Sequence, residues 1–168
     1  MQEINKILDK IYLPRFQELP VETLYMGELL IYLNDTLAFI KDGDDKIITK
    51  TMINNYVKSG LISTPIKKKY NNEHIAYLIV ITILKHSFSL EETQILINFQ
   101  KKHVPNVLAY NYFRKDFVHC LRKIINQEEI EHTQATGFNG YPVFLIQLAI
   151  ELIAGKIFFQ LSLKNLDK

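Results

Sequence analysis

Apolar residues recur at helical spacing along most of this chain, and this pattern is the strongest constraint on its fold. The clearest case covers residues 21–40, where Met26, Leu29, Leu33 and Leu37 mark one face of a helix. The same reading predicts helices over residues 3–13, 49–59, 73–86, 90–101, 104–126 and 141–163. The sequence therefore predicts a mostly α-helical protein.

The charge of the chain is distributed unevenly. Its net charge is only +2, but residues 1–45 contain 4 Lys or Arg against 9 Asp or Glu, whereas residues 46–97 contain 7 against 3. Between Lys46 and Lys69 there are six lysines and no acidic residue. Such a local basic segment attracts an anionic polymer, although a run of lysines is also typical of a solvated turn.

The predicted helix within this segment has a signal at each end. Thr49 is placed to cap its first turn, and Gly60 is placed for the left-handed residue that follows a helix. Met52, Ile53, Tyr56 and Val57 form its apolar stripe, and the opposite face carries Lys50, Thr51, Asn54, Asn55 and Lys58. Asn can pair with an adenine edge, and Lys and Thr can reach phosphates, so this face suits DNA as well as plain solvent.

Four pieces of sequence in a fixed order resemble the winged-helix DNA-binding module of MerR-type regulators. They are Tyr56 with Gly60-Leu61, the basic run Lys67-Lys68-Lys69-Tyr70, the helix that follows it, and the segment from Phe88 to Glu92. The resemblance covers residues 19–97, and the chain resembles even more closely an uncharacterised bacterial family known only as a domain of unknown function. One departure is that Asn54-Asn55-Tyr56 stands where MerR-type helices commonly carry Arg followed by two Tyr.

This resemblance implies a winged helix-turn-helix (MerR-like) with a recognition helix at about 49–59 and a basic wing at 65–70. Lys50, Thr51, Asn54 and Asn55 would then face the major groove, and Tyr56 and Lys58 would help to contact or orient phosphates. Lys67, Lys68 and Lys69 would form the wing contacts, with Tyr70 packed at the base of the wing. The implied function is transcription regulation by binding duplex DNA.

The C-terminal part is predicted to be a separate helical region. We divide the chain into a DNA-binding region with N-terminal helices, residues 1–100, and a dimerisation or sensor region, residues 101–168. Its two apolar helices exceed what a small head can cover, so we expect them to pair with each other and with a second copy in a homodimer. They lack a sustained heptad pattern, which favours a helical bundle over a long coiled coil.

Other functions and partners are weighed against this reading. Aromatic residues of the C-terminal half could line a pocket for an apolar small-molecule effector, but they fit a plain core as well. Neighbouring Glu131 and His132 lack a third ligand at a usable offset, so residues 127–141 are predicted to form a solvated loop. No catalytic arrangement, metal site or cofactor motif is recognised, and we do not expect an enzyme.

The remaining alternative is a module that binds another protein on a winged-helix scaffold without reading DNA sequence.

Cys120 is the single cysteine and falls in an apolar helical pattern, which fits the core of a protein in a reducing cytoplasm. The last predicted helix approaches the length of a membrane span. Gln147, Glu151, Lys156 and Gln160 interrupt it, however, and predict packing against protein instead of lipid.

Overall fold

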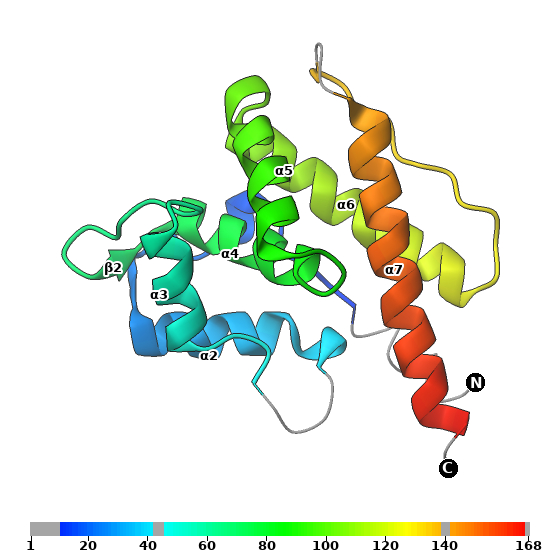
Figure 1. The fold of residues 1–168 in the computed structure, drawn as a ribbon, viewed down its shortest axis with the longest axis horizontal. Coiled ribbons are helices and arrows are strands. Elements are labelled where there is room, and N and C mark those ends of the chain that lie inside the picture. The colour runs from blue at the N-terminus through cyan, green and yellow to red at the C-terminus, as the bar shows by residue number, and fades with distance from the viewer. Residues whose placement is uncertain (1–10, 42–45, 139–141, 167–168) are drawn as a thin grey trace.

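A computed structural model describes residues 11–41, 46–138 and 142–166, and the fold is mostly helical as predicted (Figure 1). Within these residues the α-helices are α2 (Met26–Thr36), α3 (Lys50–Lys58), α4 (Asn72–Leu84), α5 (Leu90–His103), α6 (Asn106–Ile125) and α7 (Val143–Leu166). Short 3-10 helices η1 (Phe16–Glu18) and η2 (Ala38–Ile40) and strands β1 (Leu24–Tyr25) and β2 (Lys69–Tyr70) complete the described elements. The helix predicted over residues 3–13 falls mostly outside them.

The helix predicted over residues 21–40 is shorter than its pattern suggested. Leu24 and Tyr25 are extended and pair antiparallel with Tyr70 and Lys69, so the chain enters α2 from a small two-stranded sheet. The Tyr25 N–H donates to the Glu28 carboxylate at 2.8 Å, which satisfies one of the free donors at the start of α2. After Leu37 the chain tightens into η2. Pairing with a distant strand has replaced the first turn of the expected helix.

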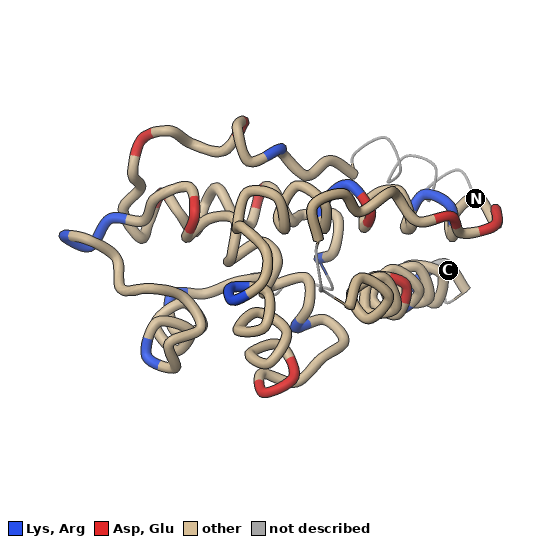
Figure 2. Tube along the Cα trace, turned by 90° about the horizontal axis from the view of Figure 1, so that it is seen from above, with Lys and Arg blue, Asp and Glu red and all other residues tan. Residues whose placement is uncertain are grey.

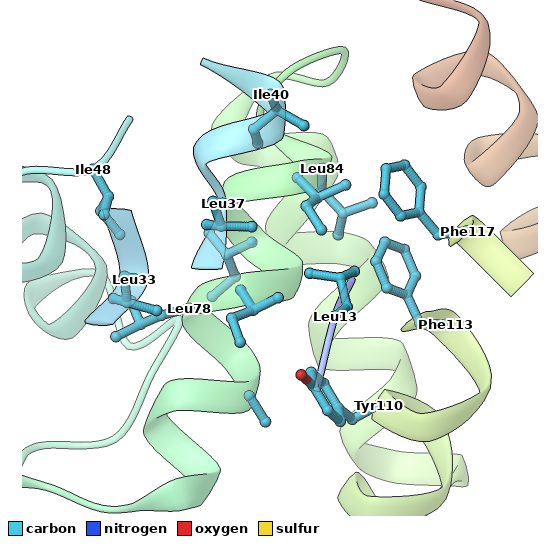
Figure 3. Close-up of a cluster of buried hydrophobic side chains, with 14 of the residues drawn as sticks. Leu13, Leu33, Leu37, Ile40, Ile48, Leu78, Leu84, Tyr110, Phe113 and Phe117 are labelled. Carbon is cyan, nitrogen blue, oxygen red and sulfur yellow. The ribbon is translucent and has the colours of Figure 1, made fainter. Parts of the chain in front are cut away.

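Helix α4 is the centre of the hydrophobic core. It is buried on nearly all sides, as its uniformly apolar sequence predicted. In Figure 3, Leu78 and Leu84 of α4 lie between Leu33 of α2 and Phe113 and Phe117 of α6. The core cluster thus includes residues on both sides of the predicted domain boundary at residue 100.

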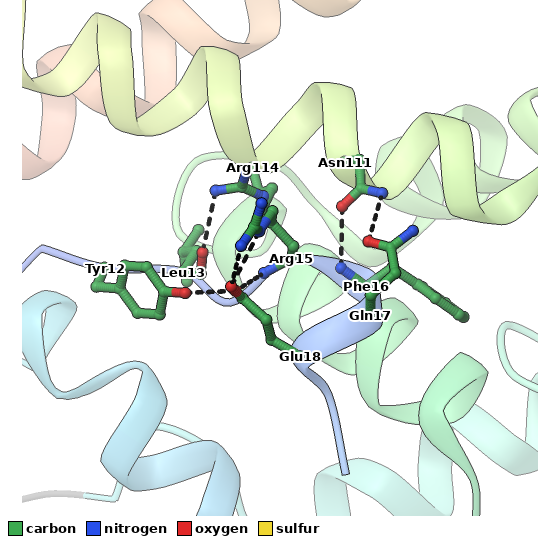
Figure 4. A network of polar contacts seen from close by, with 8 residues as sticks. All are labelled: Tyr12, Leu13, Arg15, Phe16, Gln17, Glu18, Asn111 and Arg114. Atoms are coloured by element: carbon green, nitrogen blue, oxygen red, sulfur yellow. Dashed lines mark hydrogen bonds and ion pairs between the residues drawn. The ribbon is translucent and has the colours of Figure 1, made fainter. Parts of the chain in front are cut away.

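Residues 13–16, which precede α2, lie across α6 and form hydrogen bonds to it (Figure 4). The Tyr110 hydroxyl donates to the Pro14 carbonyl at 2.9 Å, and the Arg114 guanidinium donates to the Leu13 carbonyl at 3.2 Å. The Phe16 N–H donates to the Asn111 amide oxygen at 2.9 Å. These bonds join the N-terminal segment to a helix about one hundred residues later in the chain.

Helices α6 and α7 pack against each other, which confirms that the two apolar C-terminal helices pair. Helix α7 lies along one edge of the molecule (Figure 1). Its length and composition alone would let it cross a membrane, but the mostly buried core helices of soluble proteins share these properties, and α7 itself is partly buried. Such a helix is therefore weak evidence for a membrane span.

Candidate nucleic-acid interface

Helix α3 begins and ends where its sequence predicted. The Thr49 hydroxyl accepts from the Met52 N–H at 3.3 Å, which caps the first turn. Gly60 follows the last turn with φ of +75°, in the left-handed region that favours glycine. The Gly60 N–H donates to the Val57 carbonyl, and the Leu61 N–H donates to the Tyr56 carbonyl. These two bonds form a Schellman motif, which stops the helix sharply.

The two faces of α3 separate as predicted. Lys50, Thr51, Asn54, Asn55 and Lys58 are all exposed, whereas Ile53 is buried. Tyr56 was predicted to lie in the apolar stripe, and its 4% exposure and its place in the core cluster confirm this. So little exposed surface favours the helix-orienting role of Tyr56 over the phosphate contact that the resemblance also implied.

Neighbouring helices hold α3 at both ends through backbone carbonyls and amides. The Asn34 side chain of α2 donates to the Ile48 carbonyl at 3.0 Å and accepts from the Ile47 N–H at 3.0 Å. From α5, the Gln94 amide donates to the Ser59 carbonyl at 3.1 Å, and the Lys101 ammonium donates to the Leu61 carbonyl at 2.8 Å. The orientation of the exposed face of α3 is therefore set by side chains that the sequence pattern did not single out.

The basic run predicted as a wing forms a tight turn into β2. The Lys69 N–H donates to the Ile66 carbonyl at 2.9 Å, and Ile66 and Lys69 form an isolated β-bridge. Between them, Lys67 and Lys68 have φ of 50° and 63°, so both are left-handed. Two successive positive φ angles are the mark of a type I′ turn, in which Asn and Gly are favoured and lysine is strained. Both strained lysines are exposed.

The side chains of the other two predicted wing residues, Lys69 and Tyr70, pack against neighbouring rings. The Lys69 ammonium lies over the Tyr25 ring at 4.9 Å from its centroid, so it joins the two strands. Tyr70 is 4% exposed and packs edge-on against His74, at the base of the turn, where it was predicted. Of the four predicted wing residues, Lys67 and Lys68 are thus the two that are exposed.

A buried histidine anchors both sides of this turn. His74 contacts Asn71 through Nδ1 at 2.7 Å and Ser63 through Nε2, 3.0 Å from the hydroxyl and 3.2 Å from the carbonyl. Burial lowers the pKa of His74, although its bond to Ser63 and the charge of Glu73 oppose this shift. The neutral imidazole ties the loop after α3 to the start of α4.

Basic positions therefore gather at one end of the molecule. Figure 2 shows Lys positions at the turn before β2 and on α3 at the same end of the molecule, where Asp or Glu positions of other segments also lie. From Lys46 to Asn72 the chain contains no Asp or Glu. Among the described residues, no acidic side chain forms an ion pair with Lys46, Lys50, Lys58, Lys67 or Lys68. This end can attract an anion without first breaking an ion pair to a described residue.

A second polar cluster lies away from this interface. Residues 127–138 form a largely exposed loop, as predicted, but His132 and Thr133 within it are held against the helices. His132 was expected in a solvated loop, but its Nδ1 lies 2.8 Å from Asp116 of α6 and its Nε2 lies 2.8 Å from Glu151 of α7. Asp116 is fully buried and also accepts from the Thr133 N–H at 2.6 Å. The loop is therefore clamped between two helices.

Burial and the nearby carboxylates of Asp116 and Glu151 shift the pKa of His132 and of the neighbouring Cys120. Burial alone would lower the pKa of His132, but hydrogen bonds to Asp116 and Glu151 and their charges outweigh it and raise the pKa. Burial, with Asp116 and Glu151, raises the pKa of Cys120 to about 12, so the thiol stays neutral in the core. Within the described part of the chain, no group of three or more His, Cys, Asp or Glu side chains is placed to hold a metal ion.

An apolar cavity of about 50 Å³ lies between α4, α5, α6 and α7. Four aromatic residues of the C-terminal half line it, as the predicted effector pocket would require: Tyr110, Tyr112, Phe113 and Phe138. An apolar cavity that admits benzene measures roughly 150 Å³. The space therefore fits at most a very small apolar molecule unless side chains move.

Comparison with known proteins places the chain in a family. Residues 14–114, more than half of the chain, match a domain of unknown function, DUF1836. The chain belongs to this family, which agrees with the resemblance to an uncharacterised family. No curated protein and no solved structure matches it.

Proposed function

We propose that this protein is a cytoplasmic transcriptional regulator that binds duplex DNA as a homodimer, through a MerR-like winged helix-turn-helix. Helix α3 is the recognition helix, with Lys50, Thr51, Asn54 and Asn55 toward the major groove and Lys58 toward phosphates. The turn at Lys67 and Lys68 is the wing. The observation that carries the proposal is the position of these two exposed basic elements at one end of the molecule, in a segment without acidic residues.

The order of elements supports this assignment. Strand β1 leads into α2, α3 follows, and β2 returns to pair with β1, so the two-stranded sheet and the turn that precedes β2 flank α3. A wing in that position reaches the backbone beside the groove that the helix enters. The connection from α2 to α3, residues 37–49, is longer than the three or four residues of a simple helix-turn-helix. The proposal is therefore for a variant of that motif.

The strained turn adds a physical argument. A left-handed non-glycine residue costs about 1–2 kcal/mol, yet lysine occupies both positions of this turn. Strain of this kind gathers where a side chain has a function. Contact with phosphates would explain why two lysines occupy positions at which Asn and Gly are more stable.

The test is binding to random-sequence duplex DNA over a range of salt concentrations. Replacing Lys67 and Lys68 with Ala should weaken binding to all sequences alike and reduce the salt slope by roughly 2, about one for each lysine that no longer meets a phosphate. Lys69→Ala should have less effect on the slope because Lys69 packs over Tyr25. Lys102→Ala with Lys115→Ala removes the same charge from α5 and α6 and is the control. An unchanged salt slope for the first variant would remove the wing from the proposal.

Sequence readout by α3 is tested separately. Selection of bound duplexes should enrich a palindrome, and Asn54→Ala or Asn55→Ala should change the selected sequence without changing the salt slope. Absence of binding at low salt would favour the alternative, a module that binds another protein. An apolar effector remains a proposal, restricted by the small cavity to a ligand that opens it.

A further inference from the structure

The small sheet presents one of its two faces to solvent. Residues that pair directly across antiparallel strands point to the same side of a sheet. Tyr25 pairs with Lys69, and Lys69 also bridges to Ile66, so these three residues form one row across the sheet. Leu24 and Tyr70 form the neighbouring pair on the opposite face, where Tyr70 is buried. We call Ile66, Lys69 and Tyr25 the outer row.

The outer row combines apolar, cationic and aromatic side chains. Ile66 is 75% exposed and Tyr25 is 54% exposed, and the Lys69 ammonium lies over the Tyr25 ring. Among the described residues from α3 to α6, no large apolar side chain is more exposed than Ile66. Lys67 and Lys68 follow it directly and are exposed as well. A single exposed isoleucine is common on protein surfaces, but this one precedes three consecutive cations in a tight turn.

The backbone around Ile66 is held in place on both sides. Pro65 precedes it and restricts the chain there, and the Ile66 carbonyl accepts from the Lys69 N–H at 2.9 Å. His74 anchors the start of the segment through the Ser63 hydroxyl, 3.0 Å from its Nε2. The branched side chain of isoleucine also has few rotamers of its own. Ordering Ile66 against a partner therefore costs little conformational entropy.

The minor groove of a DNA duplex matches this combination of groups. Phosphates line its edges and attract cations, and apolar side chains such as isoleucine can enter it as a wedge between two base pairs. The turn at Lys67 and Lys68 lies at the same end of the molecule as α3, so it can reach a groove next to the one that α3 would enter (Figure 1). Beyond Tyr25 the surface becomes acidic, because the exposed Glu28 accepts from the Tyr25 N–H at 2.8 Å. The contact therefore ends at Tyr25 and does not extend along α2.

We propose that Ile66 is a minor-groove wedge, which selects DNA by how easily one base step unstacks. The inference rests on the DNA binding of the proposed function and adds to it a residue that determines specificity. The free energy gained by burying one isoleucine is similar in size to the cost of unstacking one base step. Ile66 therefore enters only weakly stacked steps, which are the pyrimidine–purine steps TA and CA/TG. Lys67 and Lys68 contact the flanking phosphates, which carry no sequence information.

The experiment is selection of bound duplexes by the full chain and by matched variants. The wild-type chain should enrich a pyrimidine–purine step at a fixed distance from the bases that α3 selects. Ile66→Ser should lose this enrichment and bind the wild-type duplex roughly tenfold or more weakly, with the salt slope and the bases selected by α3 unchanged. Ile66→Leu should restore the enrichment, because leucine also acts as a wedge. Ile31→Ser changes a similarly exposed isoleucine on α2, at 66% exposure, and is the control.

Unstacking of the selected step gives a direct readout of the wedge. The fluorescent base aminopurine, which brightens when it leaves the base stack, is placed at that step. Saturating wild-type chain and Ile66→Leu should both brighten it, whereas saturating Ile66→Ser should not. The Ile66 variants should keep the wild-type midpoint of urea unfolding, because the side chain is exposed and outside the core. A loss of brightening therefore reports the contact with DNA and not the stability of the fold.

The outcomes separate the wedge from the proposed function. DNA binding with an unchanged step preference and unchanged brightening in Ile66→Ser would overturn the wedge alone and leave the turn as a phosphate contact. Flotation with phosphatidylglycerol vesicles that Ile66→Ser abolishes, without any step preference on DNA, would assign the turn to lipid and overturn the wedge. We expect no flotation, because even a myristoyl chain binds membranes only marginally and one isoleucine inserts far fewer carbons. Absence of DNA binding by the wild-type chain at low salt would overturn the proposed function, and the wedge with it.

Discussion

At the scale of single residues, substitutions of Lys67 and Lys68 can change the stability of the fold and the proposed DNA binding independently. Lys67→Asn with Lys68→Gly installs the pair that a type I′ turn favours, so we expect the free energy of unfolding to rise by about 1–2 kcal/mol. The same change removes two charges and should weaken DNA binding. Lys67→Ala with Lys68→Ala removes the charges without relieving the strain and should bind as weakly but gain no stability. Urea unfolding and DNA titration of both variants measure the two effects, and wild-type affinity in the Asn-Gly variant would contradict the role of the lysines.

The clamp at His132 gives stability a dependence on pH. Because its folded pKa is raised above the ordinary 6.5, the clamp contributes fully below about pH 6.5 and its contribution is lost as pH rises through the folded pKa. His132→Gln should cost about 1–3 kcal/mol at pH 6, since buried Asp116 loses a partner, and should flatten the profile above pH 6.5. Urea unfolding between pH 5.5 and 9 measures this, with His119→Gln as the control. A variant with the wild-type pH profile would show that His132 stays neutral in the fold.

The sequence did not reveal this clamp because its members are far apart along the chain. His132 is 16 residues from Asp116 and 19 from Glu151, and only the packing of α6 against α7 brings them together. The prediction considered only adjacent Glu131 as a partner of His132, and no further ligand lies at a usable offset nearby in the sequence. The sequence also left two roles open for Tyr56, since an aromatic ring at a helix end suits a phosphate contact as well as a core position, and burial favours the second.

At the scale of elements, local signals were enough wherever the determinants lie within a few residues. The caps at Thr49 and Gly60 were predicted correctly, because a helix end depends on the backbone donors and acceptors of its own turn. Strand β1 was missed because its partner lies some 45 residues later and only two residue pairs form. The apolar pattern before Met26 therefore read as helix.

The cap at Thr49 can be tested for its effect on the proposed interface. Thr49→Ala removes the acceptor for the Met52 N–H and should cost about 1 kcal/mol of stability. Ser89→Ala removes the equivalent cap of α5 at a similar cost. If α3 reads DNA, Thr49→Ala should weaken binding more than Ser89→Ala, although neither alters charge. Equal affinities of the two variants, measured by fluorescence anisotropy alongside urea unfolding, would argue against α3.

At the scale of the whole molecule, the helical fold class followed from the sequence but the way its parts join did not. Periodicity identifies the face that a helix buries, not the partner that covers it. The bonds from Pro14 and Leu13 to α6 link residues about one hundred positions apart. The division at residue 100 was drawn where the resemblance faded, and the family match itself continues to residue 114, within α6.

The shared core predicts that the two regions unfold together. Phe117 has no exposed surface and stacks on Phe113 at a centroid distance of 6.0 Å, while Phe39, next to α2, lies 6.2 Å away. Phe117→Ala should cost about 3–5 kcal/mol, a large part of the roughly 5–15 kcal/mol that stabilises a typical domain. Hydrogen exchange followed by mass spectrometry should then show α2 and α4 losing as much protection as α6.

The matched control is Val21→Ala, which truncates a side chain that is 92% exposed and should change stability by less than about 0.5 kcal/mol. Loss of protection confined to residues 101–168 in the Phe117→Ala variant would instead mean that the boundary at residue 100 separates two independent folding units. Equal losses of protection on both sides of residue 100 would mean that α3 and the turn at Lys67 and Lys68 depend on α6 for their stability. A change in the C-terminal helices would then reach the proposed DNA-binding surface through the core.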